Sequence, residues 1–385
     1  MKLCGFIKTV LLVFGLGLFL PSAFIWAAPE KSPFDGGRTF ELSLNHKLIP
    51  PEGSAGVTRL WVPLPEDTDF QRVRQISFDG NYEKAYITLK NDAAAKTLYA
   101  EWADSGSKPE LTIRLEIVTR DWEPGRNGLL KDYRAPALIS YPKEVEQYLL
   151  ETDHIKLDGI VKQTADKIVG QESDPLKKAR LIYEWVSANM TRDESIAGCG
   201  QGDVKAILES GRLYGKCTDI NSVFVALARA SGLPAREMFG IRLGQAVKMG
   251  AYTKTALGGA DANGLANVSR GQHCRAMFYL AGFGWVPVDP ADVTKMRLAE
   301  KKEHGDPAVQ AVNDYLFGNW EMNWAGFNFG RDFNLAPEPE QTPLNNFGYP
   351  YAEVDGDPLD YYNPDVFSYK YTSQELKGTS KNGHF

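Results

Sequence analysis

Residues 215–236 read GKCTDINSVFVALARASGLPAR. The apolar side chains of this segment recur at helical spacing, at Ile220, Val223, Phe224 and Leu227. Gly232 and the proline two residues later are typical of a helix end. The segment therefore predicts an amphipathic helix over 218–230 with Cys217 at its N-terminus.

A cysteine at the start of a helix can act as a nucleophile. The unpaired backbone N–H groups of the first turn favour negative charge, which lowers the thiol pKa and increases the thiolate fraction. Cysteine is also among the most often buried residue types, so an inert core thiol at Cys217 is the plain alternative. A general acid close to the thiol would favour the catalytic interpretation.

Three strands are predicted after the helix, over 235–243, 273–280 and 285–288. The last two are joined by a tight turn at 281–284, so this hairpin places His273 near Asp289 across the ladder. The long segment 244–272 is rich in Gly, Ala and Asn and predicts either a lid or a mobile insertion.

His273 is the histidine best placed for acid and base chemistry, because it opens a strand that can hold its ring rigidly. The other histidines have no such position: His46, His154, His304 and His384. Asp289 could orient the His273 ring, as the third member of a catalytic triad does. A structural histidine and an aspartate that caps a turn before Pro290 are the alternatives.

Three motifs carry a family resemblance: the segment around Cys217, QHCRAMFYL at 272–280 and GFGWVPVDP at 282–290. Together, over about 175–295, they resemble the core of the bacterial transglutaminase-like superfamily, whose fold is related to papain. The resemblance implies that Cys217 is the nucleophile, His273 the general acid and base, and Asp289 the residue that orients the imidazole.

The sequence departs from the family pattern after the histidine. Members often carry an aromatic residue two positions on and an acidic residue two further on, where this chain has Arg275 and Met277. This departure bears on the substrate class more than on the chemistry. Animal transglutaminases also use calcium, but no Asp-rich calcium loop is visible, so the sequence predicts no metal and no cofactor.

The fold class predicted is α+β. Residues 38–122 alternate apolar and polar positions in short runs between turn signals, which predicts an N-terminal antiparallel β-sandwich. Residues 123–142 are typical of a connector. Residues 143–300 are predicted to form a papain-like, transglutaminase-type domain, with the helix that carries the cysteine packed on an antiparallel sheet.

The C-terminal part is predicted as an aromatic-rich extension over 301–372, followed by a flexible tail over 373–385. Residues 315–369 hold 14 of the 44 aromatic residues, which excludes a disordered segment. Packing on the core is the main interpretation, and an aromatic cleft wall for a sugar or peptide is the alternative.

The first 27 residues predict a cleaved signal peptide. Lys2 and Lys8 flank the start of an apolar run at 10–20, and small residues follow, with cleavage expected after Ala27. The protein is therefore expected to be bacterial and periplasmic or secreted, in contact with the membrane through this segment only. An uncleaved anchor is the alternative.

Removal of the signal peptide leaves an odd number of cysteines: Cys199, Cys217 and Cys274. One hypothesis is a Cys199–Cys274 disulfide that leaves Cys217 free, and buried unpaired thiols are the alternative. The backbone N–H of Cys217 is the expected first donor to an oxyanion. Gln201 is a candidate for the second donor, although a turn role suits it better.

Other function classes find little support. The formal net charge of −6 disfavours nucleic acid as a partner. Residues 211–217 resemble a phosphate loop, but their glycines are too close and Cys217 stands where a hydroxyl should bind magnesium. The motifs HExxH, CxxC and GxSxG do not occur. The neighbouring Asp193 and Glu194 predict a solvated turn rather than a glycosidase pair.

The sequence thus predicts an exported cysteine-dependent acyl-transfer enzyme that forms a thioester with a peptide or isopeptide amide. Hydrolysis is slightly favoured over transfer to an amine. The expected partner is a peptide or protein substrate, with cell-wall peptides among the candidates. The alternative is a non-catalytic module with this fold that binds protein or cell-wall glycan.

Overall fold

The computed structural model describes residues 34, 36–54, 56–103, 108–126 and 130–376. The predicted signal peptide, residues 1–27, lies outside this part of the chain. Within it, no helix has both the length and the apolar character needed to cross a membrane.

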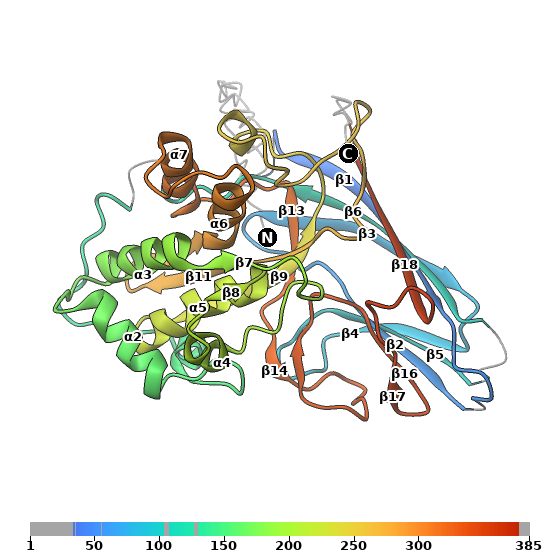
Figure 1. Cartoon of the computed structure of the whole chain (residues 1–385). Helices are drawn as coiled ribbons and strands as arrows, with labels where there is room; N and C mark the ends of the chain where they lie inside the picture. The colour runs from blue at the N-terminus through green and yellow to red at the C-terminus, as the bar shows by residue number, and fades with distance from the viewer. Residues whose placement is uncertain (1–33, 35, 55, 104–107, 127–129, 377–385) are drawn as a thin grey trace, which may run out of the picture.

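Two five-stranded antiparallel sheets face one another on the right of Figure 1. In spatial order, the first consists of β10 (Leu265–Asn267), β18 (Phe367–Leu376), β1 (Arg38–Leu48), β6 (Glu110–Thr119) and β3 (Gln71–Gly80). The second consists of β17 (Asp357–Pro358), β16 (Tyr351–Val354), β2 (Thr58–Pro63), β5 (Thr97–Trp102) and β4 (Lys84–Thr88). Apolar side chains from both sheets share one core, so the predicted β-sandwich is confirmed.

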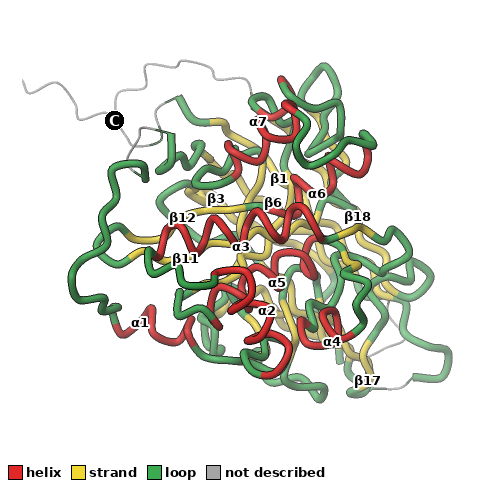
Figure 2. The backbone as a smooth tube through the Cα atoms, turned by 60° about the vertical axis from the view of Figure 1, so that its left-hand side comes forward, coloured by secondary structure: helices red, strands yellow, loops and turns green. Residues whose placement is uncertain are grey.

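A four-stranded antiparallel sheet and the helices form the other half. The sheet consists, in spatial order, of β12 (Gly284–Val288), β11 (Gln272–Leu280), β9 (Ala235–Arg242) and β13 (Trp324–Asn328). The helices are α1 (Lys143–Glu146), α2 (Gly159–Val169), α3 (Pro175–Asn189), α4 (Val204–Glu209), α5 (Cys217–Ala230), α6 (Pro290–Ala299) and α7 (Pro307–Leu316). Figure 2 shows α2, α3 and α5 in front of the strands. The α+β class and the cysteine-bearing helix on an antiparallel sheet are confirmed.

Helix α5 is the centre of this half. It packs against β11 and β9 as well as α2 and α3, and it is buried from Cys217 to Arg229. Phe224 of α5 meets Phe278 of β11 with their ring centroids 6.2 Å apart. Because the helix is enclosed on all sides, the position of its first residue is fixed by the core.

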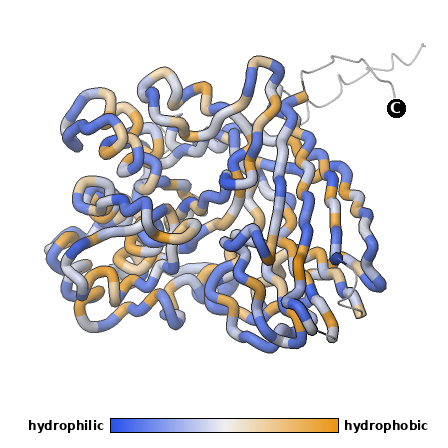
Figure 3. Tube along the Cα trace, turned by 45° about the vertical axis from the view of Figure 1, so that its right-hand side comes forward, coloured by the Kyte–Doolittle hydropathy of each residue, from blue (hydrophilic) through white to orange (hydrophobic). Residues whose placement is uncertain are grey.

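Strand β1 shows why the sandwich forms. Phe40, Leu42 and Leu44 are buried and alternate with more exposed positions. Phe40 pairs with Ile117 and Leu42 with Leu115 of β6, so the apolar faces of the two strands coincide. In Figure 3, orange and blue segments alternate along the strands on the right.

The predicted tail and the predicted sandwich boundary need correction. Residues 373–376 are not loose, because they belong to β18, which pairs with β1 over ten residues. β10, from the long segment 244–272, pairs in turn with β18. An edge at β1 would leave a row of backbone groups unpaired, and β18 satisfies them. Thus the sandwich combines the N-terminal strands with strands from the C-terminal part.

The two halves share buried side chains. Ile241 of β9 and Phe327 of β13 belong to the sandwich core. Trp320 and Trp324 are fully buried between the halves, in a cluster with Phe70. The remaining short elements are β7 (Thr191–Arg192), β8 (Tyr214–Gly215), β14 (Arg331–Phe333), β15 (Leu344–Asn346), η1 (Gln147–Leu149) and η2 (Met249–Ala251).

Candidate active site

The start of α5 is held by Asp219. Its Oδ2 accepts a hydrogen bond from the backbone N of Lys216 at 2.8 Å, and its Oδ1 accepts one from the backbone N of Gly202 at 2.7 Å. A Cβ at Gly215 would lie 2.2 Å from the Cβ of Asp219, so only glycine fits there. These contacts bring two loop segments to the first turn, which begins at Cys217.

Three free thiols meet at this turn. The thiols of Cys199 and Cys274 are the neighbours with the largest influence on the pKa of the Cys217 thiol. Cys199 is held in place by its carbonyl, which accepts from Thr218 N at 2.8 Å, and by the Tyr349 hydroxyl, which donates to its Sγ at 3.2 Å. The hypothesis of a Cys199–Cys274 disulfide is wrong, because both thiols are free. Cys199 Sγ donates to the Gln272 carbonyl at 3.4 Å, and Cys274 Sγ donates to Thr218 Oγ1 at 3.6 Å. The alternative of buried unpaired thiols is confirmed.

His273 lies beside this thiol. Its Nε2 is 2.7 Å from Oδ2 of Asp289, and its ring is only 5% exposed. His273 acts on the pKa of the Cys217 thiol, and the two residues line the same cavity. Trp324 Nε1 also donates to the His273 carbonyl at 2.9 Å. The structure therefore brings together all three residues that the sequence singled out.

The hairpin register explains the pairing of His273 with Asp289. Ala276 of β11 lies opposite Val288 of β12. Continuing this register by one residue places Arg275 opposite Asp289, and His273 two residues beyond on the same face. Side chains at such diagonal positions are within reach of one another. The sequence prediction of proximity was therefore right, and the residue directly opposite Asp289 is Arg275.

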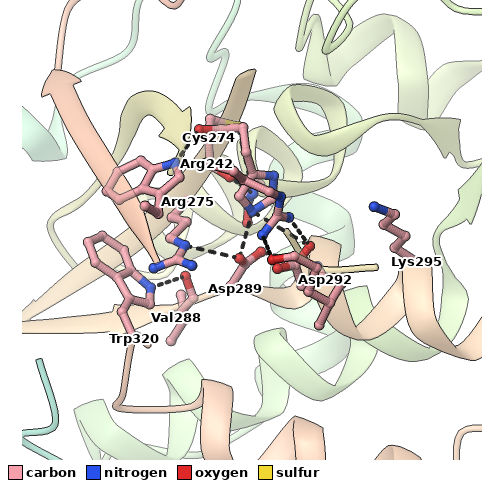
Figure 4. Close-up of polar contacts among 12 residues, drawn as sticks. Arg242, Cys274, Arg275, Val288, Asp289, Asp292, Lys295 and Trp320 are labelled. Carbon is pink, nitrogen blue, oxygen red and sulfur yellow. Dashed lines mark hydrogen bonds and ion pairs between the residues drawn. The ribbon is translucent and has the colours of Figure 1, made fainter. Parts of the chain in front are cut away.

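Arg275 is a buried counter-ion of Asp289. Its side chain is fully buried, and its Nε lies 3.5 Å from Asp289 Oδ2. In Figure 4 this contact is the dashed line that reaches the Asp289 carboxylate from Arg275 on its left. The guanidinium also lies over the rings of Trp320 and Trp324, at 5.5 and 4.9 Å from their centroids. The family position usually held by an aromatic residue thus carries a charge that contacts Asp289.

Asp292 and Arg242 also belong to this cluster, and sequence reasoning missed both. Asp292 Oδ1 lies 2.6 Å from Arg242 Nη2 and 3.7 Å from His273 Nε2. The backbone N of Asp292 donates to Asp289 Oδ1 at 3.1 Å, so Asp289 caps α6 as well. The spacing Asp-Pro-Ala-Asp at 289–292 is the sequence signal that could have identified Asp292. It is typical of a capped helix start, and it puts two carboxylates close together.

The electrostatics favour a protonated His273. Burial and the charge of Arg242 lower its pKa, whereas the carboxylates of Asp289 and Asp292 raise it, and the net effect is a pKa above the usual 6.5. The imidazolium form is therefore stabilised inside the site.

The same environment favours the thiolate of Cys217. The thiols of Cys199 and Cys274, together with the ring and charge of His273, hold the pKa of Cys217 well below 9.0, although burial opposes them. The neighbouring thiols shift the other way: the pKa of Cys199 and that of Cys274 are raised. Only the central thiol is thus set up to ionise.

The site opens into a cavity of about 830 Å³. Cys217 and His273 are part of its lining. The segment 244–272 supplies another part, with lining residues between Gly244 and Gln272. Four tyrosines of the C-terminal segment complete it: Tyr349, Tyr361, Tyr362 and Tyr369. Aromatic residues of this segment thus both pack in the core and form a cleft wall.

Two further candidates of the sequence analysis lie elsewhere or have other partners. Gln201 is exposed and outside the cavity lining, and its Oε1 accepts from Asn345 at 2.9 Å. The prediction of Gln201 as a candidate for the second oxyanion donor is therefore wrong. Asp193 accepts from the hydroxyl of Ser195 in a turn, whereas Glu194 lies at the cavity and pairs with Arg192 at 2.5 Å.

A metal ion at this site would compete with two arginine side chains for the carboxylates. His273, Asp289 and Asp292 each offer a ligand atom, and these atoms lie within 4.8 Å of one another. The guanidinium groups of Arg242 and Arg275 already face the two carboxylates. The charge of this set is therefore balanced by the chain itself, and a cation would have to displace two buried arginines from their partners.

Comparisons with known proteins identify relatives of this chain. Residues 162–290 match the family model of the transglutaminase-like superfamily core. An uncharacterised protein of Haemophilus influenzae is 58% identical over 337 residues, which cover 88% of this chain and 91% of that protein.

One solved structure with a TM-score above 0.5 is similar to this chain at the level of fold. A candidate cysteine protease of Cytophaga hutchinsonii is similar with a TM-score of 0.53 and 11% identity, covering 91% of this chain and 94% of that one. The periplasmic domain of TgpA from Pseudomonas aeruginosa matches with a TM-score of 0.32 and 13% identity, over 70% of this chain and 92% of that one.

Proposed function

This chain belongs to the transglutaminase-like superfamily, and from that premise we propose that it is an exported cysteine enzyme that cleaves peptide or isopeptide amides through a thioester. The observation that carries the proposal is the joint position of Cys217 and His273 in the lining of one cavity, with Nε2 of His273 2.7 Å from Asp289. Both groups face a cavity that a peptide segment could enter.

The chemistry follows from these positions. The Cys217 thiolate attacks the amide carbonyl, and the protonated His273 gives its proton to the leaving nitrogen as the C–N bond breaks. Water then attacks the thioester, His273 removes one of its protons, and the S–C bond breaks to release the acid. Asp289 keeps the ring oriented and stabilises its positive charge in both steps.

Hydrolysis is the proposed outcome rather than transfer to an amine. Water reaches an open cavity without a dedicated site, whereas an amine must be bound next to the thioester to compete with it. A screen that follows both free acid and amide product from the same peptide distinguishes the two outcomes.

The test is the pH dependence of alkylation at Cys217, read by mass spectrometry at this residue. In the wild type, alkylation is expected to be fast well below pH 8.5, the pKa of a free thiol, because the thiolate is stabilised. His273→Ala is expected to move the half-maximal rate to higher pH. His304→Ala is the matched control, since His304 contacts Ser187 and Glu184 outside the cavity.

One result would contradict the enzyme. A Cys217 that reacts as an ordinary thiol in both the wild type and His273→Ala would show that no ion pair forms. The binding module would then be the better hypothesis. A fast, His273-dependent reaction supports the enzyme and justifies the screen over peptides and amines.

Export is also a proposal, supported by Lys2, Lys8 and the apolar run at 10–20. The mass of the mature protein from a fractionated bacterial host tests it. A chain that starts at residue 28 in the periplasmic or secreted fraction supports export, and a full-length chain in the cytoplasm contradicts it.

A further inference from the structure

The net charge of the cavity lining is opposite in sign to the net charge of the whole chain. Five basic residues line it: Arg192, Lys216, Arg242, Arg270 and Lys295. Among the described residues that line it, only Glu194 and Asp292 are acidic, which leaves a formal charge of +3 on this part of the lining. The whole chain carries −6. Positive charge is therefore concentrated at the cavity.

Much of this charge has no internal partner. Arg242 is paired with Asp292, and Glu194 is shared between Arg192 at 2.5 Å and Lys216 at 3.8 Å. Arg270 and Lys295 have no carboxylate within 4.0 Å among the residues that the structure describes. Arg270 and Lys295 are thus available to a ligand. Arg192 and Lys216 share one carboxylate, so their positive charge is only partly balanced.

Lys295 is the best placed of them. It follows Asp292 by one turn of α6, and in Figure 4 its ammonium is drawn apart from the carboxylates, with no dashed line. Its Nζ donates to the carbonyl of Ala256 at 2.7 Å, which leaves other donor positions free. Burial and the charges of Arg242 and Arg192 lower the pKa of Lys295, and the charges of Asp292 and Cys217 oppose them. The ammonium is therefore half-buried, surrounded by excess positive charge, and within electrostatic reach of the nucleophile.

We propose that this site selects acyl donors that carry a carboxylate close to the scissile amide, that is, acidic peptides, and that Lys295 is its main specificity residue. This inference rests on the proposed function, because it concerns the substrate of the same site. Lys216 precedes the nucleophile in the chain and is the second positive neighbour. A carboxylate there would replace Glu194, whose side chain is 74% exposed and can move out at little cost.

The remaining lining supports a peptide rather than a small anion. Tyr349 and Tyr361 are stacked at 5.2 Å, and Tyr362 meets Tyr361 at 4.4 Å. Such a surface binds apolar or aromatic groups, which inorganic phosphate lacks. The volume of about 830 Å³ is also that of a site for several residues.

The test compares two alkylating agents that differ in charge. Iodoacetate is anionic and iodoacetamide is neutral. With both agents the Cys217 sulfur forms a bond to the CH2 carbon, the C–I bond breaks and iodide is released to solution. The ratio of their rate constants cancels differences in thiolate fraction between variants. In Lys295→Gln the iodoacetate to iodoacetamide ratio is expected to fall about two- to fivefold, as for one partly exposed charge. In Glu194→Gln the ratio is expected to rise.

Matched controls separate this inference from the proposed function. Lys162→Gln removes an exposed lysine of α2 that pairs with Asp166 and lies outside the cavity, so both rates should equal those of the wild type. If neither agent modifies Cys217 faster than a free thiol, the proposed function fails. If iodoacetamide reacts fast but the ratio is the same in the wild type, Lys295→Gln and Glu194→Gln, only the acidic preference is overturned.

A protection experiment identifies the source of the carboxylate. Iodoacetamide labelling of Cys217 is measured with a Glu-containing peptide amidated at its C-terminus, with a neutral peptide that has a free C-terminus, with its neutral amidated form, and with inorganic phosphate. Protection by the first indicates a side-chain carboxylate, and protection by the second a terminal one. Equal protection by the neutral amide, protection by phosphate alone, or none overturns the proposal.

Discussion

Cys217 owes its proposed reactivity to neighbours that lie far from it in sequence. The thiols of Cys199 and Cys274 both lower its pKa, and His273 adds a positive charge. Hydrogen bonds to an ionised acceptor are about twice as strong as those between neutral groups. The reactive thiol is thus stabilised by two ordinary thiols as well as by the histidine.

The contribution of Cys199 can be measured by substitution. Cys199→Ala removes the polar neighbour that lowers the Cys217 pKa most, so this pKa is expected to rise and alkylation at a fixed pH below its midpoint to slow by about tenfold, the size of one hydrogen bond to a charged group. Cys199→Ser keeps a polar group at this position and should retain most of the rate. The pH profile of alkylation at Cys217 provides the measurement. Identical midpoints in the wild type and the alanine variant would show that the neighbouring thiol has no effect.

At the scale of elements, two helix starts build the site. α5 presents Cys217, and α6 begins at Asp289, which both caps the helix and orients His273. Asp292 and then Lys295 follow at steps of three residues along α6. A single helix therefore supplies the orienting carboxylate, its buried neighbour and the proposed specificity residue.

The start of α5 depends on Asp219, which is only 5% exposed. In Asp219→Ala the backbone N–H groups of Lys216 and Gly202 lose their acceptor inside the protein, so we expect a loss of about 1–3 kcal/mol in the free energy of unfolding. Urea unfolding measures this loss. Asp203→Ala is the control, since Asp203 caps α4 with one bond, to Ala206 N, at an exposed position. A cost no larger than that of the control would contradict a structural role of Asp219 in the site.

At the scale of the whole molecule, β18 joins the beginning of the described chain to its end. Leu44 of β1 pairs with Tyr371, and His46 pairs with Tyr369. His46 is 1% exposed, and its Nε2 lies 2.6 Å from the Tyr371 hydroxyl. The sandwich core thus contains a titratable group at the pairing of its first and last strands.

This histidine predicts acid sensitivity. Burial lowers the pKa of His46 from 6.5 to about 3. Between these values the unfolded chain binds a proton that the folded chain does not, so stability falls with decreasing pH by up to about 1.4 kcal/mol per unit. In His46→Gln this slope is expected to be smaller between pH 6.5 and 5, as measured by urea unfolding.

The comparison with the variant isolates His46. The contribution of His273 to the pH dependence of stability has the opposite sign, because its pKa is raised in the folded state and its stabilisation is lost as pH rises. This contribution is the same in both proteins. Equal slopes in the wild type and His46→Gln would contradict the prediction. At pH 8 the two proteins differ only by the packing and hydrogen bond of the side chain.

Much of the site could be predicted from local patterns. Helical spacing from Ile220 to Leu227 located α5, and the turn at 281–284 set a register that brings His273 to Asp289. These features depend on residues that are neighbours in the chain, where side-chain direction follows the period of the backbone. For the same reason the sequence determined the α+β class and the sandwich strands up to β6.

Only the tertiary structure decided the rest. The union of β1 with β18 joins residues more than 300 positions apart, and no local pattern encodes which edge a strand will fill. The meeting of Arg242 with Asp292, and of three thiols at Cys217, depends on how α5 and α6 pack on the sheet. Ionisation inside the cavity follows from burial and from charges contributed by distant segments, and both exist only once the chain has folded.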